Sequence, residues 1–311
     1  MKLSQLEHIL AATQALQAVL AQIPALSGLS EADCLKAAPG RAAFKARIGG
    51  QDLVLKLLTG PESAALTRTH AQVLADSARR MGAGLNRVPG LIDAFPEHGL
   101  LLMDWVPGQN MSKGIFRADP GARAALLRRA AGWLDWFVAD TRSEGRIATG
   151  FWQRELLKYR AKLSDTYQFS GISVVLVEFA LAQIATLADQ PVTRAFTHGD
   201  FKPDNLMVDG DVLWGIDLEQ AGERALGVEI AYVQFELGHR PPDLQVDPAY
   251  GAALADVAPF IERGLISDTE ARAVLPFFMA MLLAKHCYEV QPKSGESAYI
   301  LASERFLAAM T

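Results

Sequence analysis

The sequence predicts an α+β protein with two lobes: a small antiparallel-sheet lobe at the N-terminus and a larger, mainly helical lobe at the C-terminus. The chain has 311 residues, more than a single hydrophobic core usually serves. Half of its residues are hydrophobic, which is enough for a packed interior and excludes a disordered chain. Short apolar runs broken by Pro and Gly dominate the first third of the chain, and long helical stretches follow. We therefore expect one lobe in residues 1–105 and the other in residues 106–311.

The N-terminal segment is predicted to be an amphipathic helix that packs on the body of the protein. Its apolar residues recur at helical spacing, at Leu3, Leu6, Leu10, Leu16, Leu20 and Ile23. Polar and charged residues between them interrupt any apolar core of a signal peptide. No run reaches the roughly 18 apolar residues of a membrane span, and "LPFFMAMLLA" at 275–284 is typical of a buried helix. Cys34 and Cys287 lie far apart and form no CxxC pair, so we expect a cytoplasmic protein.

The first lobe is predicted to hold a small antiparallel sheet and one helix. Residues 33–58 consist of short apolar or alternating runs separated by a Pro-Gly and a Gly-Gly pair, the pattern of strands joined by turns. After Pro61, a typical first helical residue, Leu66, Val73 and Leu74 are spaced to form one buried face. Two further strand candidates follow, "RVPGLIDAF" and "GLLLMDWV". The second lobe is expected to begin with helices around 120–141, 151–166 and 174–188.

One stretch, "FTHGDFKPDNLMVDGDVLWGIDLEQAG" at 196–222, concentrates charged residues among apolar ones. Composition alone would produce the pattern His-x-Asp-x-x-x-x-Asn roughly 0.0035 times in this chain, so chance is a poor explanation. Asp209-Gly210 lies between two apolar runs and predicts a hairpin with a two-residue type I′ loop. Such a hairpin would bring Asn205 and Asp217 to one open end, next to the loop that contains Asp200. Oxygen ligands of this kind suit Mg²⁺.

These residues resemble a known family. "HGDFKPDN" followed by "IDLE" is similar to the catalytic and metal-binding segments of the aminoglycoside phosphotransferase and choline kinase family, the small-molecule branch of the protein-kinase-like fold. Upstream, "LVLKLL" looks like the strand of the nucleotide-binding lysine, and "GLLLMDWVPG" looks like the last small-lobe strand running into the hinge. Downstream, "ALGVEIAYV" resembles the segment after the metal-binding strand. The match covers roughly residues 33–235 in the same order.

The resemblance implies a two-lobed protein-kinase-like fold, with nucleotide binding in residues 1–105 and catalysis and substrate binding in residues 106–311. It implies ATP and Mg²⁺ as cofactors. Asp200 would accept or orient the proton of a substrate hydroxyl, and Lys202 would reach the γ-phosphate. Asn205 and Asp217 would hold Mg²⁺ on the phosphates. The remaining nucleotide-binding positions are Lys56, Gly40, Met103, Asp104 and Val106.

The sequence departs from the family's pattern at two places in the first lobe. Related kinases have a glutamate halfway along the helix that follows the lysine strand, whereas this chain has His70 and Gln72 and no acid there. The usual partner of Lys56 is therefore in doubt, because Glu62 fits better as a helix-start acid. The phosphate loop "APGRAAF" supplies one glycine, Gly40, where a full Gly-rich loop supplies several.

Three further residues of the motif region have both functional and structural readings. His198 is expected to support the loop through a bond to backbone rather than to take part in chemistry. Glu219 would reach a second Mg²⁺ or a substrate amine, or would only cap a turn. Glu229 is more readily explained as a helix N-terminal residue than as a site residue.

The preferred function is an ATP-dependent phosphotransferase acting on a hydroxyl of a small molecule, such as a sugar, amino sugar or amino alcohol. Carboxylates such as Glu219 and Glu236 would favour an amine on that molecule. A protein serine/threonine kinase is the first alternative, suggested by Lys202, although there is little room for an activation loop before Glu229. A non-catalytic nucleotide-binding scaffold is the second. A net charge of −5 argues against a nucleic-acid partner, no membrane partner is expected, and the oligomeric state is left open.

Overall fold

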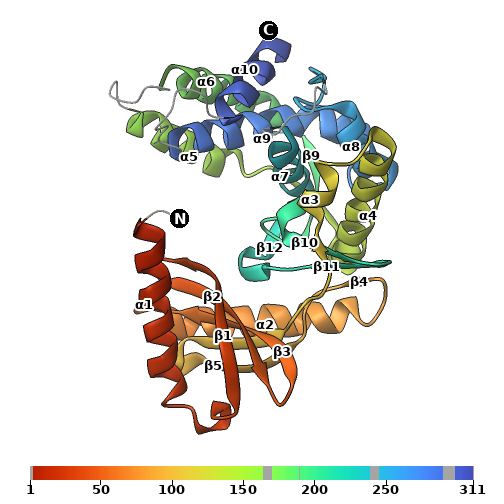
Figure 1. Cartoon of the computed structure of the whole chain (residues 1–311). Helices are drawn as coiled ribbons and strands as arrows, with labels where there is room; N and C mark the ends of the chain where they lie inside the picture. The colour runs from red at the N-terminus through yellow and green to blue at the C-terminus, as the bar shows by residue number, and fades with distance from the viewer. Residues whose placement is uncertain (1–2, 164–169, 189, 239–244, 290–297, 311) are drawn as a thin grey trace. The chain divides into compact units, whose positions relative to one another are not determined.

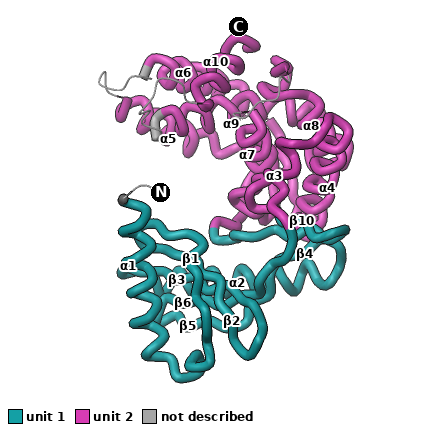
Figure 2. The backbone as a smooth tube through the Cα atoms, viewed as in Figure 1, with its two compact units in different colours: residues 1–108, 207–219 teal, residues 109–206, 220–311 magenta. Residues whose placement is uncertain are grey.

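The computed structural model describes residues 3–163, 170–188, 190–238, 245–289 and 298–310. The chain forms two compact units, which Figure 2 distinguishes by colour. Unit 1 comprises Met1–Gly108 and Met207–Glu219, and unit 2 comprises Gln109–Leu206 and Gln220–Thr311. The predicted assignment of separate functions to residues 1–105 and 106–311 stays a prediction. Each unit is described by itself below.

Unit 1 is built on a five-stranded sheet with the strand order β1-β2-β3-β6-β5. The strands are β1 (Leu29–Ala38), β2 (Arg41–Ile48), β3 (Gln51–Leu58), β5 (Leu91–Phe95) and β6 (Leu100–Asp104). All neighbouring pairs are antiparallel. Phe44, Leu53, Leu55 and Leu100 are completely buried and form the centre of its core. The antiparallel sheet predicted for the first lobe, with its two later strands, is confirmed.

Helix α1 (Leu3–Leu20) lies beside this sheet, as Figure 1 shows, but only part of its predicted apolar face is buried. Leu16 is 1% exposed and belongs to the core, together with Ile23 after the helix. Leu6 and Leu10 are 48% and 60% exposed. The helix's packed residues begin at Ala12, so the N-terminal half has no core to cover. The predicted helix is confirmed, and the expectation that its whole leucine face packs on the body is wrong for Leu6 and Leu10.

Helix α2 (Ser63–Met81) buries a different face from the predicted one. Leu74 is buried as expected, but Leu66 is 42% exposed. The buried positions are Thr67, Leu74, Ser77 and Met81, with His70 half-buried at the same helical spacing. Two of these buried residues are polar, which is why the spacing of the apolar residues did not reveal the face.

The hairpin predicted in the motif region is present with a shifted loop. It consists of β10 (Leu206–Asp209) and β11 (Val212–Gly215), and β11 pairs in parallel with β4 (Asn86–Arg87). The loop is therefore Gly210-Asp211 rather than Asp209-Gly210. Gly210 has a φ of +54°, whereas Asp211 is not among the described non-glycine residues with positive φ. The type I′ loop is ruled out because it requires positive φ at both central residues.

Unit 2 is mainly helical. Its helices are α3 (Met111–Ile115), α4 (Pro120–Val138), α5 (Thr149–Lys162), α6 (Ser170–Leu187), α7 (Leu226–Gly238), α8 (Leu254–Glu262), α9 (Asp268–Glu289) and α10 (Ala298–Met310). The three predicted helical stretches correspond to α4, α5 and α6, although residues 164–166 lie outside the described part of the chain. The segment 275–284 is buried within α9, as predicted. None of the described helices combines the length and the apolar character that crossing a membrane would need.

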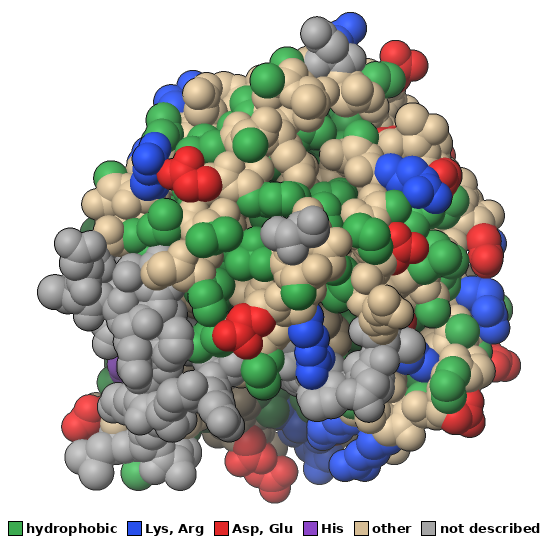
Figure 3. Space-filling model, turned by 90° about the horizontal axis from the view of Figure 1, so that it is seen from above, with side chains coloured by type: hydrophobic (Ala, Val, Ile, Leu, Met, Phe, Trp, Pro, Cys, Tyr) green, Lys and Arg blue, Asp and Glu red, His purple; other side chains and the backbone are tan. Residues whose placement is uncertain are grey.

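Unit 2 also contains short strands that carry the loop of interest. The strands β8 (Ser143–Arg146), β9 (Pro191–Thr197) and β12 (Gly222–Ala225) form a sheet with the order β12-β9-β8. The two-residue strand β7 (Gln109–Asn110) begins the unit, and Asn110 caps α3 by accepting from the backbone N–H of Ser112 at 2.9 Å. Figure 3 views the molecule from above and shows hydrophobic side chains spread among charged ones of both signs.

Candidate functional site

A cluster of charged side chains in unit 1 centres on Lys56 of β3. Leu53, Leu55 and Leu57 alternate into the core, so Lys56 stands on the opposite face of the strand. Its Nζ donates to Oδ1 of Asp217 at 2.6 Å and to Oε1 of Glu219 at 2.7 Å. The lysine side chain is 15% exposed. One buried cation is thus held between two carboxylates from the segment after β11.

The charges in this cluster determine which groups are ionised. Burial disfavours the ammonium, but the charges and hydrogen bonds of Asp217 and Glu219 outweigh it and raise the pKa of Lys56. His70 of α2 lies within electrostatic range of the same groups. Its burial, only partly opposed by the charge of Glu219, lowers the pKa of His70. An imidazole is either neutral or positively charged, so His70 cannot supply the negative charge that would pair with Lys56.

Asp217 has an unusual backbone conformation. Its φ is +69°, and it is one of two non-glycine residues with positive φ in the described part of the chain. It lies between β11 and the 3-10 turn Leu218–Gln220, with its side chain 35% exposed. Positive φ in a residue with a side chain costs free energy and is concentrated at functional sites. The strain supports a functional role for Asp217 on grounds independent of the sequence motif.

The other nucleotide-binding positions predicted in unit 1 differ in their contacts and in their exposure. Gly40 turns the chain from β1 to β2 with a φ of +78°, and its carbonyl accepts from the N–H of Thr59 at 2.9 Å. Asp104 accepts from the N–H of Gly90 at 2.9 Å, so its carboxylate ties the end of β6 to the residue before β5. Met103 and Val106 are 7% and 8% exposed. Their predicted contacts with a nucleotide stay predictions.

In unit 2 the motif loop connects β9 to the 3-10 turn Pro203–Asn205. His198 is completely buried, and its Nδ1 accepts from the backbone N–H of Asp200 at 3.3 Å. Its ring meets that of Trp133 at a centroid distance of 5.9 Å. The buried imidazole therefore supports the loop through its hydrogen bond with the backbone of Asp200, as expected from the sequence.

Asp200 is the centre of the polar contacts on this loop. Its Oδ2 accepts from Nζ of Lys202 at 2.8 Å and from Nδ2 of Asn205 at 3.0 Å. Nδ2 of Asn205 also donates to the backbone carbonyl of Asp200 at 2.8 Å. Burial disfavours the charge on Lys202, but the hydrogen bond and charge of Asp200 raise the pKa of Lys202. The loop thus brings Asp200, Lys202 and Asn205 together, with Lys202 paired to Asp200.

Glu229 of α7 has more contacts with the motif loop than its place at a helix start suggested. It is completely buried, and Oε1 accepts from the hydroxyl of Thr197 at 2.7 Å and from the N–H of Gly199 at 3.0 Å. Oε2 accepts from the N–H of Phe201 at 3.2 Å. Glu229 therefore fixes the backbone on both sides of Asp200. Burial raises the pKa of this carboxyl, against the hydrogen bond from Thr197 and the charge of Arg224.

A sequence signal for this role was available. Glu229 stands among apolar residues in "ALGVEIAYV", a run that predicts a buried helix, and a buried acid requires partners. Gly199 is also constrained, because it has a φ of +89° and an added Cβ would lie 1.9 Å from the carbonyl oxygen of Gln220. A helix-start role accounts for the position of Glu229 in the chain. It does not account for the burial of its carboxylate, which the hydrogen bonds to the motif loop explain.

The residues predicted to bind Mg²⁺ have suitable donor atoms. Asp217 carries a carboxylate, and the amide nitrogen of Asn205 is used by Asp200, which leaves its oxygen as the potential ligand atom. Among the described residues no cluster of three or more His, Cys, Asp or Glu side chains is arranged to hold a metal ion. Mg²⁺ normally takes few protein ligands and completes its shell with water and phosphate oxygens, so this donor set fits it.

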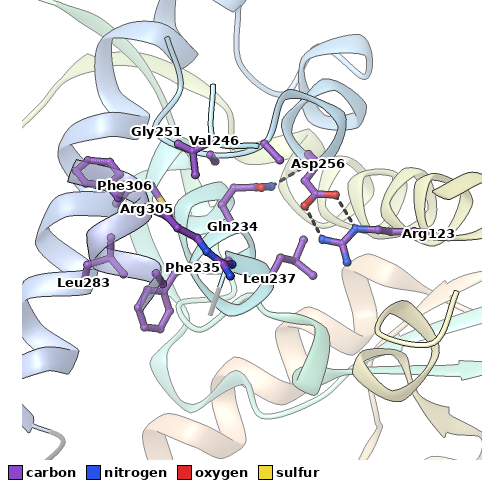
Figure 4. A pocket seen from close by; sticks show the side chains of 15 residues that line it. Arg123, Gln234, Phe235, Leu237, Val246, Gly251, Asp256, Leu283, Arg305 and Phe306 are labelled. Carbon is purple, nitrogen blue, oxygen red and sulfur yellow. Dashed lines mark hydrogen bonds and ion pairs between the residues drawn. The ribbon is translucent and has the colours of Figure 1, made fainter. Parts of the chain in front are cut away.

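A separate cavity of about 50 Å³ lies inside unit 2, away from these residues. Figure 4 shows Arg123 of α4 meeting Asp256 of α8 at its wall. The guanidinium Nε and Nη2 donate to the two carboxylate oxygens at 2.8 and 2.5 Å, and both side chains are almost fully buried. Gln234 donates to the backbone carbonyl of Asp256 at 3.1 Å. None of the predicted site residues lines this cavity.

Comparison with known proteins gives one family and several similar structures. The model of the family described as "Phosphotransferase enzyme family" matches residues 35–264. No curated protein matches the sequence significantly.

Among solved structures, aminoglycoside phosphotransferase APH(4)-Ia is 16% identical with a TM-score of 0.64, covering 96% of this chain and 98% of that one. Choline kinase LicA from Streptococcus pneumoniae is 12% identical with a TM-score of 0.62, covering 96% and 99%. A thermostable variant of APH(4)-Ia in ternary complex with AMP-PNP and hygromycin B is 14% identical with a TM-score of 0.61, covering 94% and 97%. At these identities the likeness establishes the fold, which is the predicted kinase-like one.

Proposed function

Because the chain belongs to the phosphotransferase enzyme family, we propose that it transfers the γ-phosphate of ATP to a hydroxyl group of a small molecule. The observation that carries this proposal is the braced loop around Asp200. Buried Glu229 and His198 hold the backbone next to Asp200, and its carboxylate stays 22% exposed. A positioned carboxylate of this kind is what phosphoryl transfer requires to orient the attacking hydroxyl.

Each residue of the proposed machinery has its own role. Asp200 accepts the proton of the hydroxyl, or orients it for attack. Lys202, held on Asp200 at 2.8 Å, supplies positive charge for the transferred phosphoryl group. Lys56 binds the α- and β-phosphates. Gly40, Met103, Asp104 and Val106 are the further nucleotide-binding positions in this proposal.

Mg²⁺, when bound, neutralises the negative charge that the phosphates carry during transfer. Asn205 and Asp217 are the residues that would hold it, through an amide oxygen and a carboxylate. Asp217 pairs with Lys56 at 2.6 Å, so Lys56 and the metal would share its carboxylate. The positive φ of Asp217 is a strained backbone conformation of the kind found at functional sites.

The acceptor that we propose is a sugar, an amino sugar or an amino alcohol. Solved relatives named as aminoglycoside phosphotransferase and choline kinase give this range of molecules. We also propose a cytoplasmic protein, in keeping with two cysteines that form no disulfide, and no nucleic-acid partner, in keeping with the net charge of −5.

A protein substrate is less well supported. The eleven residues between Asp217 and Glu229 include the 3-10 turn Leu218–Gln220, strand β12 (Gly222–Ala225) and the start of α7. They are used in regular structure, which leaves no segment for an activation loop.

The test is release of ADP from Mg²⁺-ATP in the presence of a panel of hydroxylated metabolites, with Asp200→Asn as the matched control. We expect a subset of the panel to stimulate ADP release by the wild-type protein and not by the variant. Phosphate incorporated only into proteins or peptides, with no stimulation by any metabolite, would contradict the proposal and favour a protein kinase.

A further inference from the structure

Lys56 has no acidic partner on helix α2, the element that follows its strand. Helix α2 contains one acid, Asp76, which accepts from Gln72 at 2.7 Å and from Arg79 at 2.8 Å. His70, on the helix face that packs inward, has no negatively charged form that could pair with the lysine. The lysine must therefore be held by groups from elsewhere in the unit.

Both of its observed partners come from the segment after β11, but they are not equivalent. Asp217 is the predicted metal ligand, so its carboxylate has a second use when a nucleotide is present. Glu219 is less exposed, at 18% against 35%, and contacts Lys56 at 2.7 Å. Its other oxygen, Oε2, lies 3.9 Å from Nη1 of Arg41, the first residue of β2. Glu219 is thus surrounded by cations of unit 1.

We propose that Glu219 is the residue that positions Lys56 for the phosphates of the nucleotide, in place of an acid on α2. The inference rests on the proposed function, since it assumes that Lys56 binds phosphates. It differs from the roles expected from the sequence, in which Glu219 contacts a second Mg²⁺, binds a substrate amine or caps a turn.

A lysine has four rotatable side-chain bonds, and a charged hydrogen bond restricts them. With Glu219 in place, Nζ of Lys56 remains at one point of the sheet surface even if Asp217 turns to a metal. Without Glu219, Lys56 keeps one acidic partner, Asp217, instead of two, so its Nζ is less well fixed even in the absence of a metal. Loss of Glu219 should therefore weaken contacts with phosphate and leave contacts with the nucleoside unchanged.

The experiment is calorimetric measurement of ADP and adenosine affinity in EDTA, which removes metal from the comparison, for wild type and Glu219→Gln. We expect the variant to bind ADP about tenfold more weakly and adenosine within about twofold of wild type, as for the loss of one charged hydrogen bond.

Asp52→Asn is the matched control. Asp52 also pairs with a lysine and an arginine, Lys45 at 2.8 Å and Arg47 at 2.8 Å, on the same sheet but away from Lys56. We expect it to bind both compounds as wild type does. If Glu219→Gln does not fold, as judged by thermal melting, Glu219→Asp replaces it, because the shorter acid keeps the charge and withdraws it from Lys56.

Each result decides the inference. Equal ADP affinity of wild type and the Glu219 variant would overturn the positioning role while leaving the phosphotransferase proposal intact. Equal losses of ADP and adenosine affinity would also overturn it, because they would indicate general damage to the unit. If wild type binds neither compound, nucleotide binding itself fails, and both proposals fall together.

Discussion

Glu219 in unit 1 and Glu229 in unit 2 stand ten residues apart and are held in opposite ways. Glu219 is partly exposed and contacts the side chains of two cations. Glu229 is completely buried and contacts mainly backbone N–H groups. Side-chain ion pairs can exchange partners when a nucleotide arrives, whereas a carboxylate bonded to backbone fixes a loop permanently. Substitutions in unit 1 should therefore affect ligands, and substitutions of the buried carboxylates in unit 2 should affect folding.

The largest expected effect extends this comparison to a fully buried ion pair. Asp256→Leu leaves Arg123 buried without its partner and should destabilise the protein by about 3–5 kcal/mol. Arg123→Met combined with Asp256→Leu should recover most of the loss, because no unpaired charge remains. Urea unfolding of the two variants measures both values. A double variant as unstable as the single one would mean that packing, rather than charge, accounts for the effect.

The next effect concerns the loop that Glu229 braces. Asp200→Asn removes the proposed proton acceptor from a loop that stays fixed, so kcat should fall by about 10²-fold or more while ATP affinity changes little. Steady-state kinetics with an acceptor from the metabolite panel, together with ATP titration, separates the two quantities. Near-normal turnover by the folded variant would remove Asp200 from the mechanism.

Glu229→Gln should cost about 1–3 kcal/mol of stability, because an amide NH₂ replaces an oxygen that accepts from backbone. The cost should depend on pH. The pKa of Glu229 is raised in the folded protein, so the unfolded state binds fewer protons and ionisation lowers wild-type stability as pH rises above the ordinary glutamate value.

The glutamine does not titrate, so the stability difference between wild type and Glu229→Gln should narrow from about pH 4.5 to pH 7. Unfolding of both proteins by urea across this range tests the sign. A difference that widens with pH would show that the loop's hydrogen bonds, not burial, dominate the pKa.

The smallest expected effect is a stability difference between two variants of Asp217, which separates backbone strain at this residue from its role in ligand binding. Asp217→Ala and Asp217→Gly both remove the carboxylate and should abolish stabilisation by Mg²⁺ with ATP. Glycine accommodates a φ of +69° without strain, so Asp217→Gly should be about 1 kcal/mol more stable than Asp217→Ala without nucleotide. Thermal shift measurements with and without Mg²⁺-ATP give both answers. Normal Mg²⁺-ATP stabilisation of either variant would show that Asp217 is not a metal ligand.

The elements whose apolar pattern was simple were predicted correctly, and those with buried polar residues were not. The short apolar run of β3 corresponds to a sheet strand, and the continuous apolar run at 275–284 corresponds to a buried helix. Helix α2 buries the polar residues Thr67 and Ser77. The face predicted from its apolar residues is therefore rotated from the face that is buried in the structure. Leu6 and Leu10 follow the helical pattern of α1 but extend beyond the core that the rest of the helix covers.

The sequence by itself determined the family, the antiparallel sheet and the residues of the motif loop, because these depend on short-range pattern and residue type. Tertiary structure alone decided the partners of the key charges. Lys56 meets Asp217 and Glu219 across 161 and 163 residues of chain. Glu229 reaches the motif loop from 28 to 32 residues away. Such contacts form between residues that are far apart in the chain and are brought together only by folding. The sequence alone does not distinguish a glutamate that is exposed to solvent from one that pairs with a lysine or is buried under a loop.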